Sequence, residues 1–526
     1  MRLHAAPCLR CGLPNTISCS EMFLSSSPMS WTDFLFECVC WPFQRFQRHV
    51  LAWVLAVVVT LSLLHSSLQE KVNGHETCDF AGQWMLGRFF YREACPELYT
   101  VEAGKRILEE GYKDKILESQ IKEILKKGHR SEIYDQGIGG ALYPPTASML
   151  FSILAVFTPA TAHAVAVFAY LLMCYGSGWM ISRITRQRLQ WGEATLLLLF
   201  FPNNFMGLML GQNQDLTLFI LVAGWYCRHR GWPFVAGLVW GLFAYKPVFA
   251  VALLLIPLAL RSTRLFLGMF LGGLLFVALT LPFTGGLQPW FRWLEVGRHA
   301  EQMYQTDRNW IWMSRDLVGL PRRKMWDTES MANVLRFNIG VWQPGGIWYR
   351  ESADGQKFFH PAVWLFWSDD FDETKHQGVY LDNIKEDVIV SPWYLTVVGY
   401  VLLGGVALIT VLVSWRSKLR SATMDGSEEV FVLTGSLLCV FHFMHYDLVS
   451  FALPVLIGVS MWSRWPLRRR ILFLGWYLIW LSRTYAFFFG NAILEIPWET
   501  FLLLLLWAWM GRVVWKENRE SSIFAV

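Results

Sequence analysis

Three groups of polar side chains interrupt apolar runs that are too short to cross a membrane alone. They are residues 203–215 (NNFMGLMLGQNQD), the tripeptide Tyr245-Lys246-Pro247 and residues 442–447 (HFMHYD). An unpaired polar group in hydrocarbon costs several kcal/mol. Irregular backbone at membrane depth persists only where protein buries it or where it lines a watery cavity. The pattern therefore predicts a polar site formed by broken helices, with Pro247 ending a helix at the lysine.

The residue types in and near these groups suit transfer from an anionic lipid-linked donor to a hydroxyl. A carboxylate, for which Asp79 is the candidate, would accept the proton of the hydroxyl. The ammonium of Lys246 would neutralise a phosphate leaving group, as a cation can without a metal. Two amides, two histidines and a second carboxylate would border the same cavity as substrate-binding residues: Gln212, Asn213, His442, His445 and Asp447.

Simpler interpretations exist for several of these residues. Asp215 and Asp447 could each cap a helix. Lys246 could extend its ammonium to the membrane interface, and His442 could be a hydrogen-bonded histidine of the protein core.

The composition identifies the class of protein in which these groups occur. Of 526 residues, 54% are apolar and 17% are charged, whereas about 25% are charged in soluble globular proteins. The mean hydropathy is positive. These values exclude a cytosolic enzyme, a disordered scaffold and a nucleic-acid binder, and they indicate a polytopic membrane protein in contact with membrane lipids.

The apolar runs predict the number of crossings, because a spanning helix needs about 20 mostly apolar residues. Six segments are clear candidates: Val50–Leu68, Ala162–Ile181, Leu265–Phe283, Trp393–Ser414, Ile471–Phe489 and Trp498–Val514. Six shorter runs lie between them: Ala194–Leu210, Leu216–Tyr226, Pro233–Tyr245, Val248–Leu260, Val430–Phe443 and Leu448–Trp462. The prediction is an all-α bundle of about twelve transmembrane helices, with a short segment at Met149–Phe157 that could only dip into the bilayer.

The distribution of Lys and Arg predicts the orientation, since short basic loops face the cytoplasm. Placing these loops inside gives a multi-pass protein of the cell membrane with both termini cytoplasmic. All three polar breaks and Asp79 then face the outer side. The predicted parts are a cytoplasmic segment 1–45, a transmembrane core 46–283 that includes an outer loop 69–146, a Trp-rich outer loop 284–392, and C-terminal helices 393–526.

The two outer loops carry further patterns. Residues 102–127 have apolar side chains near helical spacing and lysines on other faces, which is typical of an interfacial helix and equally of a solvated helix packed on the loop. The second loop contains nine tryptophans: Trp290, Trp293, Trp310, Trp312, Trp326, Trp342, Trp348, Trp364 and Trp367. They favour either anchoring at lipid headgroups or a surface that stacks on sugars.

The cysteines allow one structural prediction and no metal site. Cys78 and Cys95 both lie in the first outer loop, where a disulfide is plausible in an oxidising compartment. Two unrelated free thiols are the alternative. Cys8 and Cys11 form a CxxC motif without a second pair at zinc-site spacing, and no DxD-type motif is present. We therefore predict neither a metal nor a cofactor.

A set of short motifs in order resembles glycosyltransferase family 87, which includes polyprenyl-phosphate-mannose-dependent mannosyltransferases. The motifs run from Asp79 to about residue 283, with a further match near residue 445. They are Asp79-Phe80, Gly87, Leu98-Tyr99, Tyr143-Pro144-Pro145, Gly211-Gln212-Asn213, Ala236-Gly237, Gly241 and Lys246-Pro247. Cys78 beside the aspartate and the charged segment 102–127 depart from the family's pattern.

The resemblance implies a GT-C fold that transfers a hexose, with mannose as the default, from a polyprenyl-phosphate donor to a lipid or glycan acceptor. The reaction would invert the anomeric centre at the outer membrane face, with Asp79 as the catalytic base. Lys246 and His445 match the contacts to the donor phosphate, and Tyr143 matches the edge of the returning loop. Gln212 and Asn213 match the polar motif at the cavity.

Two other functions remain compatible with the sequence. A transporter or flippase of lipid-linked glycans would also have broken helices, although such proteins often show internal repeats and none is recognisable here. A non-catalytic assembly protein is the third possibility.

Overall fold

A computed structural model describes the helical parts of the chain and a few residues between them. The described residues are 41–68, 78–91, 98–99, 110–111, 143–201, 204–294, 349–351, 357–359, 393–416, 426–440, 445–462, 465–488 and 498–523. The chain divides into two units, Met1–Ala52 and Trp53–Val526. All residues discussed below as a candidate site belong to the second unit.

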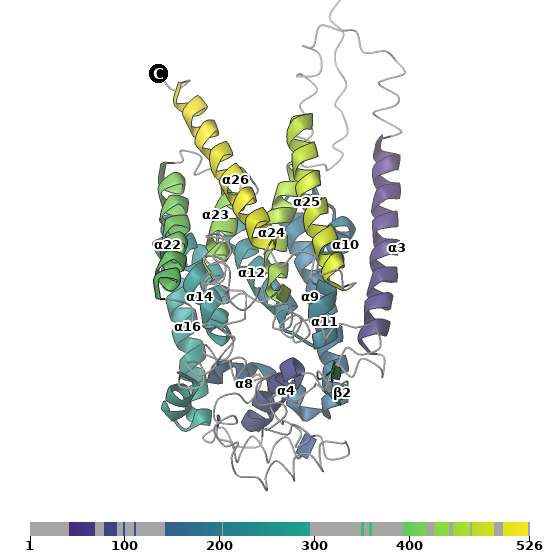
Figure 1. The fold of residues 1–526 in the computed structure, drawn as a ribbon, viewed down its shortest axis with the longest axis vertical. Coiled ribbons are helices and arrows are strands. Elements are labelled where there is room, and N and C mark those ends of the chain that lie inside the picture. The colour runs from purple at the N-terminus through teal and green to yellow at the C-terminus, as the bar shows by residue number, and fades with distance from the viewer. Residues whose placement is uncertain are drawn as a thin grey trace, which may run out of the picture. The chain divides into compact units, whose positions relative to one another are not determined.

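The described residues are almost all helical, as Figure 1 shows. The longest helices are α3 (Trp41–Ser67), α9 (Pro159–Ile184), α16 (Thr263–Thr284), α22 (Trp393–Arg416), α25 (Leu467–Phe488) and α26 (Trp498–Ile523). Each of them contains or nearly matches one of the six long apolar segments predicted from the sequence. One short antiparallel pair, β1 (Tyr349–Glu351) with β2 (Lys357–Phe359), is the exception to helix within the described ranges.

Shorter helices occupy the positions of the shorter apolar runs. They are α4 (Cys78–Tyr91), α8 (Pro145–Phe151), α10 (Trp191–Leu199), α11 (Asn204–Leu210), α12 (Gln214–His229), α13 (Pro233–Gly241), α14 (Pro247–Leu253), α15 (Leu255–Ala259), α23 (Ser427–Leu438) and α24 (Ala452–Ser460). Three 3₁₀ helices join them: η4 (Leu154–Val156), η5 (Leu242–Tyr245) and η7 (His445–Phe451). The segment Met149–Phe157 therefore forms the end of α8 and η4 rather than one helix.

Proline sets the start of four helices, namely α8, α9, α13 and α14. Pro145, Pro159, Pro233 and Pro247 each stand at the first helical position. Proline suits that position because its φ is already helical and its missing N–H has no partner to lose there. These prolines therefore fix where the four helices begin, and the start of α14 at Pro247 leaves Lys246 at the break before it.

Four described helices are long and apolar enough to cross a membrane: Gln47–Ser67, Pro159–Ile184, Thr263–Thr284 and Gly399–Arg416. Shorter apolar helices cover Pro233–Tyr245, Pro247–Ala259 and Tyr446–Ser460. These helices support a helical membrane protein, and the count of about twelve crossings stays a prediction. Helix α16 agrees with a lipid environment, because Phe270 and Leu275 are 59% and 57% exposed on it.

Helices α13 and α16 approach each other through glycines on both sides. Gly237 and Gly241 on α13 are four residues apart, as are Gly268 and Gly272 on α16. A Cβ at Gly241 would lie 2.4 Å from the backbone of Gly272, and one at Gly237 would lie 2.3 Å from the carbonyl oxygen of Leu265. Such spacing of small residues lets helix backbones touch in membranes. The contact fixes the position of α13, which is joined to Lys246 by η5 alone.

Two neighbouring glycines of α16 provide a matched test of this contact. In Gly272→Ala the new Cβ would lie 2.6 Å from the carbonyl oxygen of Leu238, whereas in Gly273→Ala the nearest atom is 3.7 Å away. We expect Gly272→Ala to destabilise the protein by about 1–3 kcal/mol, the usual cost of overpacking, and Gly273→Ala to be neutral or stabilising. Thermal unfolding in one detergent would measure both, and equal melting temperatures would contradict the tight contact.

Candidate functional site

The first polar break is a tight turn between α11 and α12. Gly211 has a φ of +65°, a left-handed conformation that glycine adopts without strain. A Cβ at Gly211 would also lie 2.8 Å from the side chain of Phe80. Gln212 and Asn213 follow the turn and are 1% and 0% exposed. The turn therefore places two amide side chains inside the protein at the start of α12.

The second break is a single residue, Lys246, between η5 and α14. The residue before a proline avoids the helical region, and Lys246 has φ −138° and ψ 72°. Its side chain is nearly buried, and the residue is 8% exposed. The Thr146 hydroxyl of α8 donates to the carbonyl oxygen of Ala244 at 2.9 Å and so ties the break to α8. Burial shows that the side chain of Lys246 lies inside the protein rather than along its surface.

The third break brings a carboxylate to this lysine. Asp447 of η7 is 1% exposed, and its Oδ1 forms an ion pair with Nζ of Lys246. The rings of Phe249 and Tyr446 lie 5.1 Å and 5.7 Å from the ammonium. Asp447 therefore does more than cap a helix, and it joins two segments that are 201 residues apart in the sequence. Removing one partner of such a buried pair leaves an uncompensated charge.

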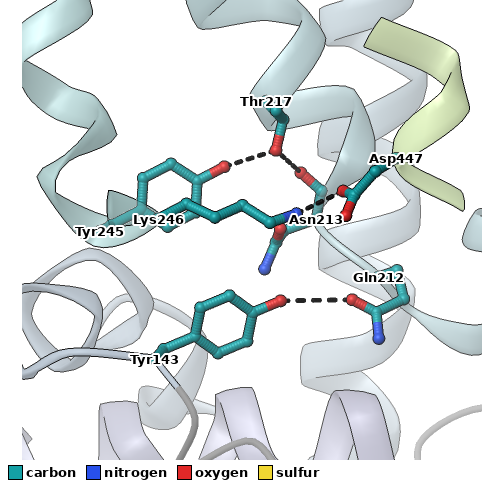
Figure 2. Close-up of polar contacts among 7 residues, drawn as sticks. All are labelled: Tyr143, Gln212, Asn213, Thr217, Tyr245, Lys246 and Asp447. Atoms are coloured by element: carbon teal, nitrogen blue, oxygen red, sulfur yellow. Dashed lines mark hydrogen bonds and ion pairs between the residues drawn. The ribbon is translucent and has the colours of Figure 1, made fainter. Parts of the chain in front are cut away.

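Hydroxyl groups connect the first break with the second, as Figure 2 shows. Oγ1 of Thr217 lies 2.7 Å from the hydroxyl of Tyr245 and donates to the backbone oxygen of Asn213 at 3.1 Å. The Tyr143 hydroxyl donates to Oε1 of Gln212 at 3.3 Å, and the ring of Tyr143 stacks on that of Tyr245 at 6.4 Å. The three breaks therefore form one polar cluster with Tyr143 at its edge.

The side-chain amide of Asn213 is unsatisfied at both of its polar atoms. Neither Nδ2 nor Oδ1 has a hydrogen-bond partner among the described residues, although the residue is fully buried. In the view of Figure 2, this amide lies between the Lys246–Asp447 pair and the Tyr143–Gln212 pair. Buried amides without partners are rare in proteins and call for a ligand or an ordered water. The amide of Asn213 can therefore donate to a ligand through Nδ2 and accept through Oδ1, beside the ammonium of Lys246.

Helix α4, which carries Asp79, packs against the first break. Nε2 of Gln83 donates to the carbonyl oxygen of Gly211 at 3.1 Å. Phe80 is fully buried, and its ring meets that of His163 edge to face at 5.0 Å. These contacts hold the first turn of α4 beside the Gly211 turn. The side chain of Asp79 itself lies outside the described residues.

Several other predictions also fall outside the described residues. They concern the side chains of Cys78 and His445, the whole of His442 and Cys95, the first forty residues and nearly all of segments 102–127 and 295–392. The proposed disulfide, interfacial helix and Trp-rich surface thus stay predictions. Among the described residues, no group of three or more His, Cys, Asp or Glu is placed to hold a metal ion.

The structure adds residues that the sequence patterns did not single out. Thr217 lies one helical turn after Asn213, and that i, i+4 spacing is the signal that could have identified it. Asp215 accepts hydrogen bonds from the thiol of Cys174 at 2.9 Å and from the amide of Gln214 at 3.0 Å. Asp215, for which the sequence also allowed a helix cap, thus forms a buried network with Cys174 and Gln214.

Comparison with known proteins identifies the family of this region. The model of glycosyltransferase family 87 matches residues 141–342, which contain Tyr143, Gln212, Asn213 and Lys246. Residues 141–342 are therefore similar to glycosyltransferase family 87. No curated protein and no solved structure matches the chain.

The match to glycosyltransferase family 87 covers less than half of the chain, and it supports the class of activity. It favours a membrane glycosyltransferase over the transporter and the non-catalytic assembly protein. Asp79 and Asp447 lie outside the matched residues, so their place in the site depends on the contacts described above.

Proposed function

We propose that this protein transfers mannose or another hexose from a polyprenyl-phosphate donor to a lipid or glycan acceptor. The reaction takes place at the outer face of a GT-C-type bundle and inverts the anomeric centre. The observation that carries the proposal is the nearly buried Lys246 at a helix break, next to the unsatisfied amide of Asn213.

Lys246 supports a phosphate-containing donor. A buried ammonium in a polar cluster stabilises negative charge that develops on a leaving group, because little water is present to screen it. Gln212 and Asn213 can hydrogen-bond the sugar or the phosphate, and Tyr143 stands at the edge of the cluster. His442 and His445 belong to the proposed donor site through their place in the third break.

Asp79 supports the acceptor half of the reaction. The acceptor oxygen would attack the anomeric carbon while the bond from that carbon to the phosphate oxygen breaks. Asp79 would take the acceptor proton, and the electron pair of the broken bond would leave with the phosphate beside Lys246. The packing of Phe80 and Gln83 on the Gly211 turn keeps the backbone of Asp79 near the polar cluster. No step of this scheme passes through a metal.

The class of donor can be tested with purified protein in lipid. The protein is given radiolabelled polyprenyl-phosphate-mannose, the corresponding glucose and arabinose lipids, or a nucleotide-linked mannose, with membrane extract as the source of acceptor. We expect label transfer and release of polyprenyl phosphate from at least one lipid-linked sugar. Transfer from the nucleotide sugar alone would refute the proposed donor class.

A further inference from the structure

The cation of the polar cluster is already paired before any donor binds. Lys246 is 8% exposed and Asp447 is 1% exposed, and the two form an ion pair. Among the described residues, no second charged group lies within ion-pair distance of this ammonium. A phosphate bound at Lys246 must therefore share the ammonium with a carboxylate.

The surroundings strengthen the electrostatic effect of that carboxylate. The rings of Phe249 and Tyr446 lie 5.1 Å and 5.7 Å from the ammonium. The other side chains drawn in Figure 2 are all neutral, namely Tyr143, Gln212, Asn213, Thr217 and Tyr245. Charges interact strongly in such poorly hydrated places. The charge near Lys246 thus includes that of the Asp447 carboxylate.

The proposed reaction changes the charge of the phosphate. A polyprenyl-phosphate sugar is a phosphodiester with one negative charge. When the bond to the anomeric carbon breaks, the electron pair stays on the phosphate, and the released phosphomonoester carries close to two charges at neutral pH because its second pKa is about 6. The second charge would face Asp447 as well as Lys246.

We propose that Asp447 makes this site prefer a singly charged phosphodiester to a doubly charged phosphomonoester. The pair of Lys246 and Asp447 has no net charge, so it attracts phosphate less than lysine alone would and opposes the additional charge of the product. Asp447 is then a specificity-determining residue that disfavours retention of the released lipid phosphate. This inference rests on the proposed donor class.

The test compares three lipids with the same polyprenyl chain: the phosphate, its methyl ester and the mannosyl donor. The methyl ester differs from the phosphate mainly in charge and carries no sugar. Binding is measured to purified protein in phosphatidylcholine nanodiscs at about pH 8, where the phosphomonoester is doubly ionised. We expect wild-type protein to bind the methyl ester about tenfold more tightly than the phosphate or better, given one extra like charge near the carboxylate.

Two variants test whether Asp447 is the cause. Asp447→Asn removes the charge and keeps an oxygen that can accept from Lys246, so the preference should disappear or reverse. Asp447→Glu keeps the charge and should keep the preference. Melting temperatures measured on the same samples report whether each variant folds.

The outcomes separate this inference from the proposed function. If wild-type protein binds none of the three lipids, the donor class is wrong and the inference falls with it. If wild-type protein binds the donor but binds the phosphate as tightly as the methyl ester, only the inference is overturned, whether or not the variants fold. An unchanged preference in a folded Asp447→Asn protein overturns it as well.

Discussion

Replacing Lys246 by Met is expected to lower turnover of a lipid-linked donor by about 10²–10³-fold, the usual effect of removing a group that stabilises transition-state charge. Methionine retains most of the length of the side chain but has no charge to place beside the leaving phosphate. The same change leaves Asp447 buried without its cation. Loss of one partner of a buried pair also costs about 3–5 kcal/mol of stability, so the single variant alone does not separate catalysis from folding.

A double variant, Lys246→Met with Asp447→Asn, makes that separation. It removes both charges, and neutral replacement of a buried pair is often tolerated. We expect its melting temperature to recover towards the wild-type value while turnover stays low. Turnover and thermal unfolding of the same preparations would be the measurements. Recovery of turnover together with stability would mean that Lys246 acts only through the fold.

Replacing Asp79 by Asn is expected to reduce turnover by about 10²–10⁴-fold, the range for loss of a general base, while donor binding is retained. Asparagine has the shape of aspartate but cannot take the proton of the acceptor hydroxyl. Donor affinity should change little because the phosphate contacts assigned to Lys246 are untouched. Release of polyprenyl phosphate and equilibrium donor binding should be measured side by side.

Glu110→Gln is the control for that experiment. Glu110 is a partly exposed carboxylate that pairs with Arg88 of α4 at 3.3 Å, so it lies on the same loop as Asp79 without a role in the proposed reaction. We expect its turnover to match that of wild-type protein. An Asp79→Asn protein that keeps wild-type turnover would show that another group accepts the proton.

Much of the helical framework is predictable because it depends on local chemistry. The six long apolar segments coincide with helices, and Pro247 fixes the break at Lys246 through the geometry of its own ring. The polar residues 203–215 predict a break between two helices, and Gly211 within that break has a left-handed φ. These features need no information about distant parts of the chain.

The partners of the polar residues could not be predicted in the same way. Lys246 and Asp447 are 201 residues apart, and the sequence offered several cations and carboxylates for either of them. The tertiary packing of η7, which lies against α12, brings the two side chains together. The side-chain amide of Asn213 lacks hydrogen-bond partners among the described residues because of which residues surround it in the fold. The sequence alone does not show whether a given amide will find a partner.

The glycine contact between α13 and α16 has a consequence for how a long lipid could enter. Backbones that touch at Gly241 and Gly272 have no side chains that could rearrange to let one helix slide along the other. Lys246 follows α13 by only one short 3₁₀ turn. Its backbone is therefore held by the rigid contact between α13 and α16. We therefore expect Lys246 to keep its position when a donor headgroup binds.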